Sequence, residues 1–243
     1  MGPIGEQIYG WILSDGFAGG IKEVRGLVRG HSCIVGNAIH YLCKLGFADG
    51  RIQDLVDMLL RMQWDDGGWN CDRKPAAHSS SFNSTAIAVR GLVTYKRTCN
   101  SASVDAHIAR GIAFLVDRQL CKRKSTNEIA HQDFMKLFFP EYYHYSYLYG
   151  LKVVAESGHG HVEQLDFALD CLNNQKTALG WSAGKKYYWK SKAERAGRSL
   201  ISWETAKGGG VNDFITLDAL KVLRHFGKAG ASDGNPQRSG HGI

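Results

Sequence analysis

Apolar residues recur at positions i, i+3 and i+4 in three segments that each end in glutamine, which predicts three amphipathic helices. The segments are residues 52–63 (IQDLVDMLLRMQ), 108–119 (IARGIAFLVDRQ) and 164–175 (QLDFALDCLNNQ). Their terminal glutamines stand at positions 63, 119 and 175, a constant step of 56 residues. A fixed step of this length is typical of a protein built from structural repeats.

A second set of predicted helices alternates with the first and is less charged. These segments are residues 32–45, 80–95, 144–155 and 211–226. A helix that is apolar on nearly all sides is usually interior. We therefore predict an all-α fold of helix hairpins without a β-sheet, with inner and outer helix layers. The hairpins are expected to form an α/α toroid, either a closed barrel or an open arc.

The predicted domain covers residues 1–227. It contains about four hairpins, an irregular segment at 122–142 and a loop at 182–210. A loop this long is usually functional or mobile, so we expect it to act as a flap over a cavity. Residues 228–243 are rich in glycine and serine and lack an apolar period, which predicts a disordered tail.

Two of the outer helices run into the same turn pattern. Gln63 is followed by WDDGG and Trp69, and Gln175 is followed by KTALG and Trp181, so both read Q-x4-G-W. Glycine ends a helix at low cost. A glutamine amide can bond the backbone groups freed at the turn. We expect each glutamine and each tryptophan to bridge neighbouring hairpins.

The segment QWDDGGW at residues 63–69 resembles the QW motif of squalene–hopene and oxidosqualene cyclases. The same repeat type occurs in the β subunits of protein prenyltransferases. Residues 31–72, 78–92 and 137–151 resemble short bacterial proteins called squalene cyclase-like or prenyltransferase-like, so the resemblance covers about residues 31 to 226. It implies an α/α toroid that cyclises or transfers an isoprenoid or similar apolar small molecule in its cavity.

The chain departs from the motifs of those families. It has no Asp-x-Asp-Asp proton donor, no Asp-Asp-x-x-Asp magnesium motif and no Asp-x-Cys zinc arrangement; Asp65 and Asp66 lie inside the turn instead. Rings of the family usually have about six hairpins, so this array would be open or completed by another chain in an oligomer. A non-catalytic toroid that binds a lipid, a peptide or a partner protein is therefore the alternative to an enzyme.

The predicted inner helices begin with polar residues that can titrate or bind metal. They are His31, Cys33, His78, His144 and Asp213, with Cys71 in the loop that precedes His78. Because every hairpin repeats the same chain direction, these groups are expected to converge at one mouth of the array.

Three interpretations of this polar rim stay open. The first is a zinc site, since two thiolates and two imidazoles suit tetrahedral zinc; the ligands would be Cys33, Cys71, His78 and His144. The second is general acid–base catalysis by His78, His144 or Asp213, because histidine titrates near neutrality. The third is structural, because polar residues cap helices and free cysteines behave as small buried hydrophobes.

Aromatic residues are dense between positions 138 and 149. Aromatic rings in terpene cyclases line the cavity and stabilise cations, whereas aromatic stripes in most helices belong to the core. Tyr145 and Tyr149 share one helical face. The candidate substrate-binding residues are His31, Trp69, Tyr145 and Tyr149.

Composition changes this picture little. The formal net charge is +7, from 30 basic and 23 acidic side chains. The basic residues are scattered, so we expect a solvated surface and no nucleic-acid partner. No stretch of 18 apolar residues and no signal-peptide pattern is present, and the six cysteines form no CxxC pair. These features predict a cytoplasmic protein with reduced thiols and no transmembrane segment.

Overall fold

The computed structural model describes residues 2–142, 144–160, 162–187, 189–190, 198–199, 203 and 210–227. This part of the chain is mostly helical, so the predicted all-α class is confirmed. The principal helices are α1 (Pro3–Ile12), α3 (Ser32–Lys44), α4 (Ile52–Arg61), α5 (Phe82–Cys99), α6 (Asp105–Val116), α7 (Tyr147–Ser157), α8 (Asp166–Asn174) and α9 (Asp213–His225). Shorter turns of helix are α2 (Asp15–Ala18), η1 (Gln132–Met135) and η2 (Val162–Leu165).

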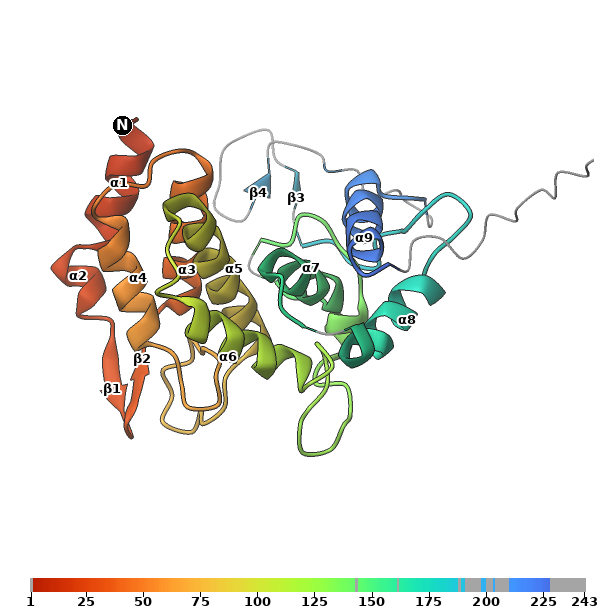
Figure 1. Ribbon diagram of the computed structural model, residues 1–243, viewed down its shortest axis with the longest axis horizontal. Helices are drawn as coiled ribbons and strands as arrows, with labels where there is room; N and C mark the ends of the chain where they lie inside the picture. Colours follow the sequence, from red (N-terminus) through yellow and green to blue (C-terminus); the bar gives the residue numbers. More distant parts are fainter. Residues whose placement is uncertain are drawn as a thin grey trace, which may run out of the picture.

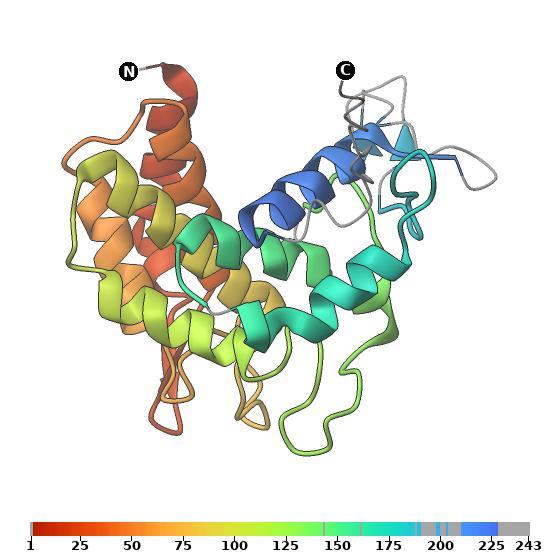
Figure 2. The same cartoon turned by 45° about the vertical axis from the view of Figure 1, so that its right-hand side comes forward.

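The inner helices α3, α5, α7 and α9 contact one another in chain order. The outer helices α4, α6 and α8 pack against α3, α5 and α7. In Figures 1 and 2 the inner helices follow an arc, with α3 near one end and α9 at the other. The inner and outer layers are thus present, whereas closure into a toroid and completion of the ring by another chain stay predictions.

Side-chain caps start three of the inner helices. Ser81, Ser146 and Asn212 precede α5, α7 and α9, and each side chain accepts a hydrogen bond from the N–H three residues ahead. Such a cap satisfies a backbone donor that has no partner within the helix. The caps explain why these three helices begin two or three residues later than the apolar pattern predicts.

The prediction of no β-sheet is wrong. Strands β1 (Lys22–Val24) and β2 (Leu27–Arg29) form an antiparallel hairpin, and β3 (Trp189–Lys190) pairs in parallel with β4 (Arg198–Ser199). The hairpin turns at Arg25 and Gly26, both with positive φ (55° and 73°). A two-residue turn of this kind matches the twist of the strands. Strands of two or three residues are too short to produce a visible alternation in the sequence.

The first Q-x4-G-W turn is fastened at its tryptophan. Trp69 has no exposed surface. Its indole Nε1–H donates to the carbonyl of Leu59 at 2.8 Å, and its backbone N–H donates to Oγ1 of Thr85 at 3.0 Å. These bonds join α4 to α5, so the predicted bridging role of Trp69 is confirmed.

The second turn repeats these bonds. Trp181 is also fully buried; its Nε1–H donates to the carbonyl of Leu172 at 2.7 Å and its backbone N–H to Oγ1 of Thr216 at 3.0 Å. In both turns the tryptophan carbonyl accepts a hydrogen bond from the N–H of the residue that caps the next inner helix. The internal repeat predicted from the sequence therefore holds at the level of single hydrogen bonds.

The two glutamines reach neighbouring segments. The amide of Gln63 donates to the carbonyls of Gly67 (2.7 Å) and His107 (3.0 Å), and the amide of Gln175 donates to the carbonyl of Met135 (3.2 Å). Gln63 thereby links the turn to α6, and Gln175 links its turn to η1.

Two predictions fall on parts of the chain that are not described. The tail at 228–243 lies outside the described residues, as does most of the predicted flap at 182–210. Among the residues that are described, none of the helices combines the length and the apolar character needed to cross a membrane.

Candidate functional site

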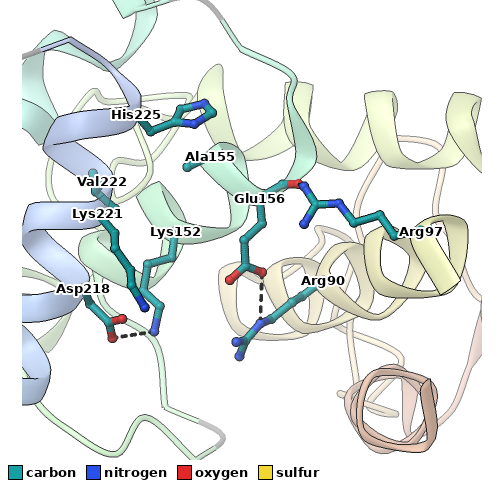
Figure 3. Close-up of a pocket in the computed structure, with 9 residues that line it drawn as sticks. All are labelled: Arg90, Arg97, Lys152, Ala155, Glu156, Asp218, Lys221, Val222 and His225. Atoms are coloured by element: carbon teal, nitrogen blue, oxygen red, sulfur yellow. Dashed lines mark hydrogen bonds and ion pairs between the residues drawn. The ribbon is translucent and has the colours of Figure 1, made fainter. Parts of the chain in front are cut away.

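A groove lies between α5, α7 and α9 (Figure 3). We call this the charged groove, and its cavity volume is about 380 Å³. Its lining consists of Arg90 and Arg97 from α5, Lys152, Ala155 and Glu156 from α7, and Asp218, Lys221, Val222 and His225 from α9. Three inner helices thus contribute to one site, as expected for residues that face the inside of an arc.

A second hollow adjoins the charged groove. We call it the aromatic pocket, and its volume is about 370 Å³. It is lined by Asn37, Tyr41, Phe139, Pro140, Glu141, Tyr142 and Tyr149, together with Arg90, Lys152 and Asp218. The last three residues also line the charged groove, so the two hollows meet at these side chains.

Lys152 lies where the charged groove meets the aromatic pocket, and its side chain is largely buried. Its ammonium group lies 2.7 Å from a carboxylate oxygen of Glu141 and 2.7 Å from one of Asp218. Burial alone would lower the pKa of Lys152, but the two carboxylates outweigh it and raise that pKa, so the ammonium stays charged. The triad fastens α7 to α9 and to the segment before α7.

Arg90 forms the corresponding link between α5 and α7. Its Nε lies 3.2 Å from a carboxylate oxygen of Glu156, and its guanidinium lies 5.7 Å from the centre of the Tyr149 ring. Burial alone would lower the pKa of Arg90, but Tyr149 and Glu156 outweigh it and raise that pKa. Arg97, two helical turns further along α5, donates to the backbone carbonyl of Glu156.

The charged groove carries an excess of positive charge. Four cationic side chains and a histidine line it, against the two carboxylates of Glu156 and Asp218. Arg97, Lys221 and His225 are exposed, whereas Lys152 is deeply set. The exposed groups are therefore available to an incoming anion, while the buried ion pairs hold the walls of the groove in place.

The sequence contains a signal for the aromatic pocket that the predictions did not use. Asn37, Lys152 and Asp218 each lie six residues after the N-cap residue of their inner helix. Polar residues at the same place in three inner helices indicate that this place faces a polar environment, because an unpaired buried charge is costly.

The four predicted zinc ligands do not form one group. The sulfur atoms of Cys33 and Cys71 lie 2.9 Å apart. His78 is exposed, with Nδ1 2.9 Å from the carbonyl of Ala76 in its own loop, and the His144 ring stacks on a tyrosine ring at 3.4 Å. In the described part of the chain, no set of three or more His, Cys, Asp or Glu is arranged to hold a metal ion. Zinc binding by Cys33, Cys71, His78 and His144 therefore stays a prediction.

The other predicted site residues are dispersed. His31 and Asp213 begin α3 and α9, which lie towards opposite ends of the arc, so a single mouth does not form. Trp69 and Tyr145 belong to the core, where the Tyr145 hydroxyl donates to the carbonyl of Leu120 at 2.7 Å. Both side chains are buried, and their predicted contact with substrate stays a prediction. Of the four predicted substrate-binding residues, Tyr149 is the one that lines the aromatic pocket.

Searches of protein-family models, of curated proteins and of solved structures find no match to this chain. The family suggested by the QWDDGGW segment therefore stays a prediction. A functional proposal has to rest on the chemistry of the charged groove and the aromatic pocket.

Proposed function

We propose that the chain binds an amphiphilic anion, of the type represented by an isoprenoid diphosphate, across the charged groove and the aromatic pocket. The observation that carries this proposal is the direct junction of the two hollows at Arg90, Lys152 and Asp218. One hollow offers exposed cations and the other offers aromatic rings. A ligand with an anionic head and an apolar body matches both at once.

The anionic head would lie in the charged groove. Arg97, Lys221 and His225 are exposed there, and hydrogen bonds from charged donors to phosphate oxygens are about twice as strong as neutral ones. Lys152 contributes less to the head, because its charge is already balanced by two carboxylates.

The apolar body would lie in the aromatic pocket. Tyr41 is 52% exposed and Tyr142 is 51% exposed, values that are high for large aromatic side chains. Phe139 stacks face to face on Phe214 of α9, with ring centres 4.4 Å apart. Burying the exposed rings of Tyr41 and Tyr142 against a hydrocarbon chain would be favourable in proportion to the apolar area removed from water.

Binding is the part of the predicted function that the groove supports. Cyclisation or transfer of the isoprenoid stays a prediction, since the chain lacks the acid motifs that would name the reaction. The alternative is a non-catalytic arc that binds a lipid, a peptide or a partner protein. A peptide or protein partner would use the same cations, and the experiment below distinguishes it from an isoprenoid diphosphate.

Calorimetric titration of the full chain tests the proposal. Three ligands are compared: farnesyl diphosphate, inorganic diphosphate as the head alone, and farnesol as the body alone. Farnesyl diphosphate should bind more tightly than either fragment. Lys221→Ala should weaken it by about tenfold, the effect of losing one charge-assisted contact worth about 1.4 kcal/mol. Lys22→Ala removes an exposed cation from β1, outside the groove, and should leave binding unchanged.

Two results would overturn the proposal. Equal affinity for inorganic diphosphate and the ester would show that the aromatic pocket takes no part. Equal weakening by Lys22→Ala and Lys221→Ala would show attraction to the net positive charge alone. The alternative would be established by two results together. Farnesyl diphosphate would not bind, and an acidic peptide would bind to the natural chain but not to Lys221→Ala.

A further inference from the structure

Two cysteines from distant parts of the sequence meet at the start of α3. Cys33 is the second residue of α3, and Cys71 follows the first tryptophan turn by two residues. Their sulfur atoms lie 2.9 Å apart, and both side chains are half-buried. A disulfide bond is about 2.0 Å long, so the pair would close by a movement of about 1 Å.

The surroundings of Cys71 stabilise a negative charge on its sulfur. The sulfur accepts the backbone N–H of Cys33 at 3.2 Å and the hydroxyl of Ser84 at 3.3 Å, and the hydroxyl of Ser32 lies at 3.4 Å. The N-terminal end of α3, with its positive dipole, adds to this effect. The hydrogen bond between the two sulfur atoms, together with these donors, lowers the pKa of Cys71, while the same bond raises the pKa of Cys33.

The loop that carries Cys71 is held in place by a buried arginine. Arg29 is 1% exposed, and its guanidinium donates to the carbonyls of Asp72 (3.3 Å), Lys74 (2.8 Å) and Ala77 (2.6 Å). The side chain also lies over the ring of Trp64 at 4.9 Å. The thiol is thus fixed at its place beside α3 by contacts that involve neither cysteine.

The repeat itself does not require this thiol. In the second turn, the position two residues after Trp181 is Ala183, and the residue before Thr216 is Ile215 instead of the serine found before Thr85. The second turn keeps the same tryptophan and threonine bonds without sulfur or hydroxyl groups at these places. The cysteine–serine arrangement is therefore an addition to the scaffold of the repeat.

We propose that Cys33 and Cys71 form a redox-active dithiol that exchanges with disulfides. The Cys71 thiolate attacks a substrate disulfide, forms a mixed disulfide and releases one thiolate. The Cys33 thiol gives up its proton and attacks the Cys71 sulfur, which releases the second thiolate. The protein pair loses two electrons and two protons, and the substrate disulfide gains both to become two thiols.

The reaction is tested on the reduced full chain with oxidised glutathione at neutral pH. Mass spectrometry should show the loss of two hydrogen atoms, and peptide mapping should place the bond between Cys33 and Cys71. Cys33→Ser should trap glutathione on Cys71, because the second attack is lost. Cys71→Ser should yield neither product at this site. Cys99→Ser, which removes an exposed cysteine elsewhere, should leave the internal disulfide unchanged.

The outcomes separate a redox pair from a structural one. Trapping at Cys71 in Cys33→Ser does not depend on whether the other variants fold. Circular dichroism of Cys33→Ser tests whether this variant itself is folded. Glutathione carried only by Cys99, with neither an internal disulfide nor a mixed disulfide at Cys71, would overturn the proposal. So would reaction of Cys71 no faster than that of the buried Cys43.

Discussion

The two tryptophan turns share a scaffold and differ in what they carry. In each, an indole bonds the end of the outer helix, a threonine hydroxyl holds the tryptophan backbone, and the preceding glycine leaves no room for a side chain. Only the first turn is followed by a cysteine whose sulfur is surrounded by donors. The residues common to both turns therefore serve the fold, and those found in one turn are the candidates for function.

The turns also differ in how tightly they are closed. In the first, the Asp66 carboxylate accepts hydrogen bonds from the hydroxyl of Ser80 at 2.6 Å and from its backbone N–H at 2.9 Å. Gln63 and His107 exchange a further bond at 2.6 Å. In the second turn, the exposed Gln175 amide donates to the carbonyl of Met135 at 3.2 Å, and the Thr177 hydroxyl donates to the carbonyl of Gly180 at 2.8 Å. The first turn thus has carboxylate and histidine hydrogen bonds in addition to the tryptophan and threonine bonds that both turns share.

The largest expected effect comes from removing either tryptophan. Trp69→Ala and Trp181→Ala should each lower the free energy of unfolding by about 3–5 kcal/mol, since both side chains are fully buried. Urea denaturation followed by circular dichroism measures the loss. Trp11→Ala is the control, because that side chain is 56% exposed. A loss at Trp181 no larger than that at Trp11 would break the equivalence of the two turns.

The next effect comes from filling the glycine position before each tryptophan. A Cβ atom on Gly68 would lie 2.5 Å from Oγ1 of Thr85, and one on Gly180 would lie 2.5 Å from Oγ1 of Thr216. Gly68→Ala and Gly180→Ala should each cost about 1–3 kcal/mol through this overlap. Gly180→Ala should be the worse of the two, because the backbone there has φ +135°.

Thermal denaturation checks these glycine variants against Gly10→Ala. A Cβ atom on Gly10 meets nothing within 4 Å, and this residue lies within α1. The control should be neutral or slightly stabilising, since alanine favours helix over glycine by up to about 1 kcal/mol. Tolerance of alanine at Gly68 would show that the close approach to Thr85 is not required.

Periodic patterns in the sequence were enough to predict the repeat. The segment 32–45 was predicted as an inner helix, and α3 spans Ser32–Lys44. The pattern gave no sign of α1 or of the β1–β2 hairpin, because the strands are three residues long and α1 falls outside the glutamine register. Local periodicity thus indicates the elements, whereas how far the arc closes depends on contacts between them.

The site was predicted less well than the fold, for a physical reason. The charged groove combines a few residues from each of three helices that are far apart in the sequence, and no short motif joins them. Cys33 and Cys71 were expected to lie together and do so, but His78 and His144 were expected beside them and are not. Residue types suggested a shared metal site, while the loop before α5 directs His78 towards its own backbone.

A smaller effect should distinguish the threonines of the two turns. Thr85→Val and Thr216→Val keep the side-chain shape and remove the acceptor for the tryptophan N–H. Leaving a buried donor without a partner costs about 1–3 kcal/mol. Thr85 has no exposed surface, so the loss of stability in Thr85→Val should lie at the upper end of this range. Thr216 is half-buried, so the loss in Thr216→Val should lie at the lower end. Equal losses in urea denaturation would show that the two turns are equally closed to water.

The smallest effect is a pH dependence confined to the first turn. His107 Nδ1 lies 2.6 Å from the side-chain oxygen of Gln63, and burial, together with the nearby charge of Arg110, lowers the pKa of His107. The second turn has Met135 as the partner of its glutamine, and methionine does not titrate. Acid should therefore weaken the first turn and leave the second unaffected.

The lowered pKa of His107 determines how the stability of the fold changes with pH. A lowered pKa means that the folded state binds the His107 proton less readily than the unfolded chain, whose histidines titrate near about pH 6.5. The contribution of His107 to stability is thus complete above that pH and is lost as the pH falls below it. His107→Gln keeps a hydrogen-bond donor for Gln63 and removes the titration. The stability of the natural chain should therefore fall relative to this variant between about pH 7.5 and pH 5.5 in urea denaturation. Parallel curves would mean that the proton is bound equally in both states, and the first turn would then differ from the second only in its number of bonds.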